Sequence, residues 1–289
     1  MSLLTLDIGG TLVKYGLWAD DGLVSHHAVP TPKTWEAFLA LLAKLIDTVD
    51  RTITGIACSF PGIVNTQTGW IGGASSVPYI HGFSMTDALT QQFQLPVSVE
   101  NDAKCALLAE HQFGHAKGQS NVALMVIGTG IGGAIMIDGK LLKGRNLYAG
   151  ELGCLLMEND IMLSDIGSTA RMVQEYTTTH QINTPIDGLG IFDLYDKGDD
   201  TARQSVHLFY DYIARGVFNT LVTIDPDLVL LGGGVSARPD FAEAIAVRVQ
   251  DMLIKQRLTD LTFDIQSCYF DNRANLIGAA VNYQQQFNV

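Results

Sequence analysis

The sequence is short of positive charge. Its 289 residues contain 18 Lys and Arg against 30 Asp and Glu, which gives a formal net charge of -12 at pH 7. Nucleic acids and anionic membrane surfaces are bound through clustered Lys and Arg, so this balance argues against both kinds of partner. A polyanionic ligand would need a local site built from backbone amides and a few cations.

Long apolar runs and paired cysteines are also missing. No segment approaches the roughly 20 apolar residues of a membrane-spanning helix, and Met1 to Asp7 lacks the basic and apolar regions of a signal peptide. Cys58, Cys105, Cys154 and Cys268 lie far apart, without a C-x-x-C spacing. We therefore expect a cytoplasmic protein with buried, unpaired thiols and no membrane association.

No linker rich in Pro, Gly, Ser or charge divides the chain, and 47% of its residues are hydrophobic. A folded protein with a sizeable core follows. We expect a hinge near residues 114–120, between an N-terminal lobe at 1–117 and a C-terminal lobe at 118–274. A last helix at 275–289 is expected to pack back on the first lobe.

Apolar patterning predicts an α/β protein. Strands are expected at 3–7, 12–18, 23–29, 53–59, 96–99, 122–127, 134–137, 228–231 and 261–267, and helices at 35–49, 85–93, 103–113, 206–224, 241–254 and 276–287. The first three strands should be antiparallel, with Asp21-Gly22 as the hairpin turn before the third.

The chain repeats one structural plan. A strand at 3–7 enters the Gly9-Gly10 turn and leaves as a second strand before an Asp-Gly hairpin. The same order recurs at 122–127, 128–133 and 134–137, again followed by Asp-Gly. Such internal similarity predicts a duplicated lobe with an approximate two-fold relation.

Three glycine turns each follow a buried strand. The first, Asp7-Ile8-Gly9-Gly10-Thr11 with Lys14, can offer backbone amides, a hydroxyl and a cation to phosphate oxygens. Asp7 at its strand end can orient magnesium through water. Taken alone, the motif is equally compatible with an ordinary glycine hairpin.

The second turn, Gly128 to Gly133, matches the G-x-G-x-x-G pattern of dinucleotide-binding folds. That fingerprint requires a helix next, whereas residues 134–137 and Asp138-Gly139 predict a strand and a hairpin. A dinucleotide fold is therefore disfavoured, and a Walker A pattern is absent. The third turn, Gly232 to Gly234, suits close approach of adenine or ribose to the backbone.

Taken in order, these motifs resemble the bacterial sugar kinases of the ROK family, within the actin-like ATPase superfamily. The resemblance covers nearly the whole chain. It rests on Asp7 to Thr11, Pro61-Gly62, Glu100-Asn101-Asp102-Ala103, Gly128 to Gly133, Gly150-Glu151-Leu152-Gly153, Gly232 to Ser236 and Gly278-Ala279-Ala280. It implies a duplicated actin-like ATPase (ribonuclease H-like) fold with two lobes around a cleft, ATP and magnesium as cofactors, and a homodimer.

The resemblance also implies a site. Asn101 and Asp102 would bind sugar hydroxyls, with Asp102 as general base when the γ-phosphoryl group of ATP passes to a hexose or hexoside hydroxyl, expected to be O6. A helix N-cap is the structural alternative for Asp102. Further sugar contacts are implied at Gly62, Ser76 and Glu151. Nucleotide contacts are implied at Asp7, Gly9, Gly10, Thr11, Lys14, Gly128, Thr129, Gly130, Gly132, Gly233 and Gly234.

The sequence departs from the common family pattern on the sugar side. Cys154 stands where most members have a His that contacts sugar and zinc, and 162–169 lacks the usual cysteine cluster, so we expect no structural zinc. Zinc-free members include kinases of β-glucosides and of N-acetylmannosamine. The segment at 162–169, together with the loop at 77–83, resembles the corresponding sequence of that subgroup. Because Ser76 replaces a frequent sugar-binding Asn, N-acetylmannosamine and glucose stay open as substrates.

A sugar-sensing regulator is the alternative from another functional class, because the family includes repressors on the same fold. Those repressors carry a DNA-binding helix-turn-helix before the first phosphate loop. Here Asp7 lies close to Met1, and the chain is acidic. Both observations argue against this alternative.

Overall fold

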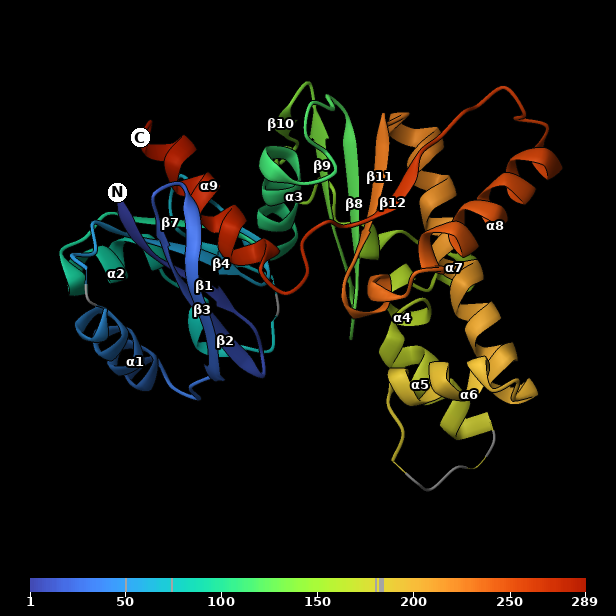
Figure 1. The fold of residues 1–289 in the computed structure, drawn as a ribbon, viewed down its shortest axis with the longest axis horizontal. Coiled ribbons are helices and arrows are strands. Elements are labelled where there is room, and N and C mark those ends of the chain that lie inside the picture. Colours follow the sequence, from blue (N-terminus) through green and yellow to red (C-terminus); the bar gives the residue numbers. More distant parts are fainter. Residues whose placement is uncertain (50, 74, 180, 182–184) are drawn as a thin grey trace. The chain divides into compact units, whose positions relative to one another are not determined.

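The computed structural model describes residues 1–49, 51–73, 75–179, 181 and 185–289 (Figure 1). They form two compact units. The first comprises Met1–Lys117, Lys143–Tyr148 and Asn272–Val289, and the second comprises Gly118–Leu142 and Ala149–Asp271. The segment Lys143–Tyr148 was expected in the C-terminal lobe but belongs to the first unit, to which the Lys143 side chain is bonded.

The first unit contains a five-stranded mixed sheet. Its strands are β1 (Ser2–Ile8), β2 (Leu12–Ala19), β3 (Gly22–Pro30), β4 (Gly55–Phe60) and β7 (Val97–Asn101), in the order β3-β2-β1-β4-β7. β2 pairs antiparallel with β1 and β3, whereas β4 pairs parallel with β1 and β7. A two-stranded hairpin of β5 (Ile63–Val64) and β6 (Ile71–Gly72) follows β4, and a 3-10 turn, η1 (Pro78–Ile80), comes next.

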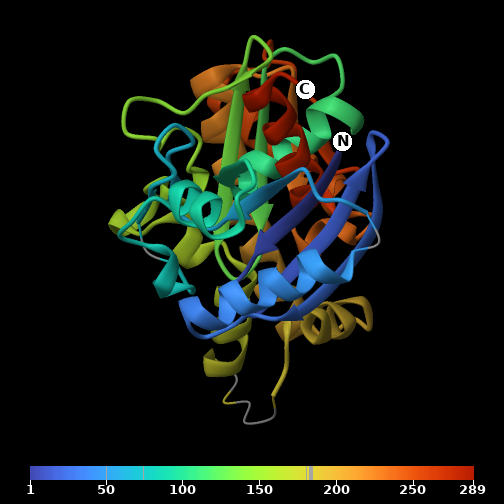
Figure 2. The same cartoon turned by 90° about the vertical axis from the view of Figure 1, so that its left-hand side faces the viewer.

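Helices cover both faces of this sheet. Phe38 and Leu42 of α1 (Trp35–Thr48) and Leu89 of α2 (Met85–Phe93) join one apolar cluster with alternate strand residues such as Leu6 and Ile56. Figure 2 views this unit with α1 in front of the blue strands. The intervening strand residues point to the opposite face, where α9 (Ala274–Phe287) packs on β1, β4, β7 and α3 (Asp102–Phe113).

The second unit repeats this sheet. Its strands are β8 (Val122–Ile127), β9 (Ile131–Ile137), β10 (Lys140–Leu141), β11 (Leu228–Gly232) and β12 (Ile265–Ser267), in the order β10-β9-β8-β11-β12. As in the first unit, the first three strands of the chain order are antiparallel and the next two are parallel. This shared topology confirms the duplication and the α/β class expected from the sequence.

The helices of the second unit contribute its core. They are α4 (Leu163–Ile166), α5 (Thr169–Thr179), α6 (Gly188–Asp196), α7 (Asp200–Ile224) and α8 (Phe241–Gln256), with 3-10 turns η2 (Leu152–Cys154), η3 (Glu158–Asp160) and η4 (Gly234–Ala237). Phe209 and Tyr210 of α7 pack with Phe192 and Phe241 in this core. No helix in the described part of the chain has the length and apolar character to cross a membrane.

Several element boundaries differ from the expectation; β12, for example, begins at Ile265 rather than at 261. The first hairpin turns at Asp20 and Asp21, with φ of 53° and 58°, because Ala19 pairs with Gly22. A two-residue turn of this kind requires positive φ at both central positions, which Asp tolerates. β9 begins at Ile131, inside the expected glycine turn, and α7 begins at Asp200, after an Asp199 cap that accepts a hydrogen bond from Ala202 N (2.8 Å).

Candidate functional site

Three polar residues form one row across the parallel strands of the first unit. Asp7 on β1 is opposite Ser59 on β4, which is opposite Glu100 on β7. Their exposed fractions are 7%, 0% and 0%. The row lies near the carboxyl ends of these strands, which is the edge where open α/β sheets bind ligands.

Asp7 is held by three side chains. Its Oδ1 accepts hydrogen bonds from Ser59 Oγ (3.0 Å) and Asn275 Nδ2 (2.9 Å), and Lys14 Nζ lies 3.4 Å from Oδ2. No group of three or more His, Cys, Asp and Glu side chains within the described ranges has the arrangement of a metal site. A single carboxylate fits Mg²⁺, since this ion usually keeps several waters and binds through one or two carboxylates plus substrate phosphates.

The first glycine turn joins β1 to β2 and is braced from β3. Gly9 N donates to Leu12 O (3.0 Å), and the Thr31 hydroxyl donates to Gly9 O (2.6 Å). Gly10 and Thr11 are exposed at the tip. A Cβ on Gly10 would lie 2.2 Å from Ser76 Oγ, so a predicted sugar residue is in contact with the predicted phosphate loop.

Asn101 and Asp102 stand at the junction of β7 and α3. Asn101 is the N-cap of α3, where its Oδ1 accepts a hydrogen bond from Lys104 N (3.1 Å). Asp102 is the first helical residue and is half-buried; its Oδ1 accepts hydrogen bonds from Asn101 Nδ2 (2.9 Å) and Ala103 N (2.8 Å). The capping role therefore belongs to Asn101, and the helix N-terminus stabilises the charge on Asp102.

Gly62 is tied to the same junction. Its carbonyl accepts a hydrogen bond from Asn101 Nδ2 (3.0 Å), and its φ of 98° favours glycine. A Cβ there would also lie 2.8 Å from Gly72 O. The structure thus brings together Gly62, Asn101 and Asp102 in the first unit, as the predicted sugar site requires.

The buried Glu100 has a cationic partner that the motifs did not indicate. Lys143 Nζ lies 2.5 Å from Glu100 Oε2 and 3.0 Å from Thr66 Oγ1, while Glu100 Oε1 accepts a hydrogen bond from Asn101 N (2.8 Å). Glu100 is fully buried, so an unpaired charge there would be costly. The positive charge of Lys143 compensates the negative charge of Glu100, the residue before Asn101.

In the second unit, hydroxyls brace the loop between β8 and β9. Thr169 Oγ1 donates to Gly128 O (2.6 Å), and Ser164 Oγ accepts from Ile131 N (2.9 Å). Thr129 and Gly130 remain exposed at the tip, whereas Gly132 lies within β9. The segment that lacks the cysteine cluster thus supports the glycine loop, and the loop joins two antiparallel strands, unlike a dinucleotide fingerprint.

The third glycine turn packs against β8, the strand that leads into the second glycine turn. Gly233 has a φ of 92°, and a Cβ there would lie 2.0 Å from Ile127 O. The Ser236 hydroxyl donates to Gly233 O (2.8 Å), and Gly234 opens η4. Two of the predicted nucleotide loops are therefore adjacent in this unit, and only glycine fits at Gly233.

Arg238 fixes the chain directly after this turn. Its NH1 and NH2 donate to both carboxylate oxygens of Asp196 (3.0 and 2.8 Å), and its guanidinium lies 4.6 Å from the centre of the Phe192 ring. These hydrogen bonds raise the pKa of Arg238 and lower the pKa of Asp196. Burial raises the pKa of the neighbouring Tyr210 to about 12. The sequence carried no signal for this pairing.

In the second unit, Glu151 directly precedes η2 and Cys154 is its last residue. Glu151 is half-buried at the start of the turn, after Gly150, whose φ is 85°. Partial burial raises the pKa of the Cys154 thiol, and the charges of Glu151 and Asp165 raise it further. Cys154, which replaces the family His, is therefore a neutral thiol at neutral pH.

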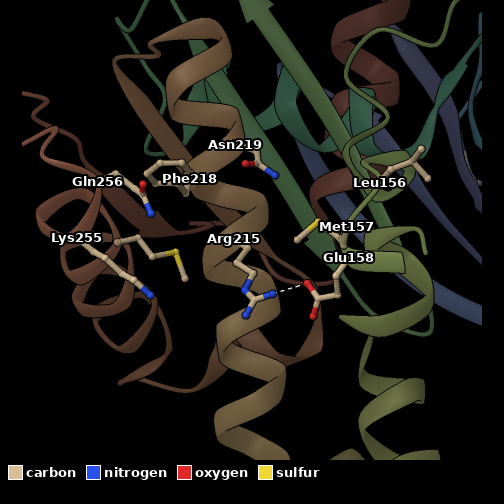
Figure 3. Close-up of a pocket in the computed structure, with 9 residues that line it drawn as sticks. Leu156, Met157, Glu158, Arg215, Phe218, Asn219, Lys255 and Gln256 are labelled. Carbon is tan, nitrogen blue, oxygen red and sulfur yellow. Dashed lines mark hydrogen bonds and ion pairs between the residues drawn. The ribbon is translucent and has the colours of Figure 1, made fainter. Parts of the chain in front are cut away.

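A separate pocket of about 390 Å³ lies in the second unit beside η3, α7 and α8. The Arg215 and Glu158 side chains on its wall form an ion pair (Figure 3). Leu156, Phe218 and Met252 contribute apolar surface. It contains none of the residues that the sequence predicts for sugar or nucleotide binding.

Comparison with known proteins places this geometry in a family. The beta-glucoside kinase of Listeria monocytogenes is 30% identical over 298 residues, which cover 100% of this chain and 99% of the relative. The N-acetyl-D-glucosamine kinase of an Escherichia coli strain is 30% identical and covers 86% of this chain and 89% of the relative. A Streptococcus pneumoniae ROK family protein solved in complex with sucrose has a TM-score of 0.90 and 36% identity, and covers 100% of this chain and 99% of that chain.

These relatives confirm the carbohydrate-kinase class expected from the motifs, and the sugar-sensing regulator is not favoured. The family model described as ROK family matches residues 3–286. The topology of both units agrees with that match, since a duplicated sheet with a glycine turn after its first strand is what the sequence motifs required. The chain belongs to the ROK family.

Proposed function

We propose that this protein transfers the γ-phosphoryl group of ATP to a hydroxyl of a hexose or hexoside, with Asp102 as the general base. The observation that carries the proposal is the row of Asp7, Ser59 and Glu100 at the carboxyl edge of the first sheet, with Asp102 two residues beyond Glu100. Asp7, the candidate residue for phosphate and cation binding, and Asp102, the candidate base, are thereby located at the same edge of the sheet. The kinase names of relatives at 30% identity support the reaction class.

Nucleotide contacts are proposed in each of the two units. In the first unit, the turn at Gly9, Gly10 and Thr11 is exposed at Gly10 and Thr11, where it offers backbone amides and a hydroxyl to phosphate oxygens, and Lys14 adds a positive charge. Asp7 would hold the magnesium ion, which neutralises charge on the phosphates, through water. In the second unit, Gly128, Thr129, Gly130 and Gly132 are proposed for phosphates, and Gly233 and Gly234 for adenosine.

The proposed sugar contacts centre on Asp102. Asn101 orients its carboxylate through the 2.9 Å hydrogen bond to Oδ1, and the carboxylate accepts the proton of the attacking hydroxyl. Gly62, Ser76 and Glu151 complete the proposed sugar set. Phosphoryl transfer depends mainly on positioning and charge stabilisation, so the fixed rotamer of Asp102 matters as much as its basicity. A homodimer and an O6 acceptor remain predictions from the family resemblance, and a cytoplasmic location remains a prediction from the sequence.

A coupled ADP-release assay tests the proposal. The protein is incubated with MgATP and glucose, mannose, N-acetylmannosamine, N-acetylglucosamine, fructose or cellobiose. Sugar-dependent ADP release that requires Mg²⁺ is expected with at least one of them. A protein that binds a sugar without releasing ADP would instead behave as a sensor, and this outcome would overturn the proposal.

A further inference from the structure

A second pocket, of about 560 Å³, lies in the first unit against the β5–β6 hairpin. It is lined by Ile63, Asn65, Thr68 and Trp70 of the hairpin, by Ser84 before α2, and by Leu147. Its volume falls within the roughly 300–1,000 Å³ of small-molecule sites. Trp70 is 48% exposed, although the residues on either side, Gly69 and Ile71, are buried.

Residues close in sequence to the pocket lining form hydrogen bonds with the residues that precede Asp102. Gly62, directly before β5, accepts the hydrogen bond from Asn101 Nδ2 (3.0 Å). Leu147, which also lines the pocket, belongs to the segment that begins at Lys143, whose Nζ bridges Glu100 and the hairpin residue Thr66. The segments that line the pocket are therefore tied, through Gly62 and Lys143, to the two residues before Asp102.

The chemistry of the lining indicates an uncharged, polar ligand with an apolar face. Among the lining residues described, none is Asp, Glu, Lys or Arg, which disfavours a phosphate or another ionic group. Asn65 Oδ1 accepts hydrogen bonds from Gln67 N (3.0 Å) and Thr68 N (3.2 Å), so the orientation of this lining side chain is fixed. An aromatic face next to amide and hydroxyl groups matches a pyranose ring, which has apolar C–H faces and a rim of hydroxyls.

The backbone at the edge of the pocket is strained. Leu147 has a φ of 67°, a left-handed conformation that is unfavourable for a branched apolar residue. Such conformations persist where the surrounding structure holds them and cluster at ligand sites. The ion pair and hydrogen bond made by Lys143 anchor this segment near the strained residue.

We propose that this pocket binds the second ring of a hexoside, stacked on Trp70, while the first ring presents its hydroxyl to Asp102. The inference rests on the proposed function of Asp102 and narrows the substrate class from any hexose to glycosides. A free monosaccharide would leave the pocket empty and gain nothing from Trp70. Trp70 is thus a specificity-determining residue and takes no part in proton transfer.

Calorimetric titration without ATP measures this directly. Glucose, cellobiose, maltose and sucrose are titrated into the full chain and into Trp70→Ala, Trp70→Phe and Tyr148→Ala. Tyr148 is an exposed aromatic residue one position beyond Leu147 and does not line the pocket. Thermal unfolding of each variant checks that the fold is retained.

At least one disaccharide should bind more tightly than glucose. Trp70→Ala should weaken that disaccharide about tenfold and leave glucose within about twofold, as expected for losing one stacked aromatic contact. Trp70→Phe should restore most of the affinity, and Tyr148→Ala should change neither ligand. Equal affinity of wild type and Trp70→Ala for all three disaccharides, or a parallel loss of glucose binding, would overturn the inference.

The ADP-release assay separates this inference from the proposed function. If glucose causes ADP release but no disaccharide affinity changes when Trp70 is replaced, the kinase proposal stands and the second-ring site is refuted. If disaccharide binding depends on Trp70 but no sugar causes ADP release, the second-ring site stands and the kinase proposal is refuted. The two hypotheses therefore fail in different experiments.

Discussion

Asn275 Nδ2 donates a 2.9 Å hydrogen bond to Asp7 Oδ1 across 268 residues of sequence. Asn275 reaches Asp7 because α9 returns to the first unit and packs on β1, β4 and β7. Ser59 donates to the same oxygen (3.0 Å). The Asp7 carboxylate, which is proposed to orient magnesium, is thus held by one side chain from α9 and one from β4.

Replacing Asn275 by Ala should weaken the response of turnover to magnesium. The change removes a group that orients Asp7, and losses of this kind cost about 10- to 100-fold in metal affinity or activity. A titration of kcat against Mg²⁺ should shift to higher concentration while the KM for sugar stays near wild type. Gln285→Ala, an exposed change on the same helix, is the control. An unaltered magnesium titration would remove Asn275 from this role.

Replacing Asp102 by Asn should separate binding from turnover. The amide keeps the shape of the side chain and its place beside Asn101 but cannot accept the hydroxyl proton, so kcat should fall by about 10²- to 10⁴-fold. Calorimetric affinity for the sugar should change little. Asp87→Asn, an acidic residue in the first turn of α2, should leave kcat unchanged. Near-normal turnover of the Asp102 variant would refute its role as base.

Replacing Lys143 by Met should destabilise the first unit. Glu100 is fully buried and would lose its cation, a change that costs up to about 3–5 kcal/mol in the free energy of unfolding. The double variant with Glu100→Gln should recover part of this loss in urea denaturation. Arg51→Met, at the exposed ion pair with Asp20, should cost less than about 1 kcal/mol. Equal effects of the two single changes would contradict the assignment.

Gly278→Ala should destabilise the packing of α9 on α3. A Cβ at Gly278 would lie 1.7 Å from the Cys105 carbonyl oxygen, so the helices would have to separate. Overpacking of this kind costs about 1–3 kcal/mol or more, measured by thermal or urea unfolding. Gly22→Ala is the control, since its Cβ would meet no atom within 4 Å. The glycine of the Gly278-Ala279-Ala280 motif then serves helix packing rather than ligand contact.

Cys154 should react with iodoacetamide more slowly than other accessible thiols do. Alkylation requires the thiolate, and burial together with Glu151 and Asp165 raises the pKa of this thiol. At pH 8 its labelling, followed by mass spectrometry, should lag behind a free cysteine peptide and accelerate as the pH rises. Cys58 and Cys105 are buried with raised pKa values and should label only after unfolding. Labelling of Cys154 at the peptide's rate would show that its pKa is not raised.

Local pattern was sufficient for many of the elements. The helix at Met85–Phe93 and the strand at Val122–Ile127 have the bounds that apolar spacing predicts. The Asp138-Gly139 turn also forms as expected, with both residues at positive φ. The first hairpin turns one residue earlier than its Asp-Gly pair suggests, because the pairing of Ala19 with Gly22 places Asp20 and Asp21 at the centre. Strand register, which is a non-local property, decided that position.

The duplicated plan, the three glycine turns and the family could be inferred from the amino-acid sequence, because periodicity, glycine positions and motif order are local or sequential properties. The sequence also placed Asp102 between a strand and a helix. The partners of the acidic residues became known from the three-dimensional fold: Ser59 and Asn275 hold Asp7, Lys143 pairs with Glu100, and Asn101 rather than Asp102 caps the helix. These contacts depend on strand register and on the return of α9, and no local pattern encodes either.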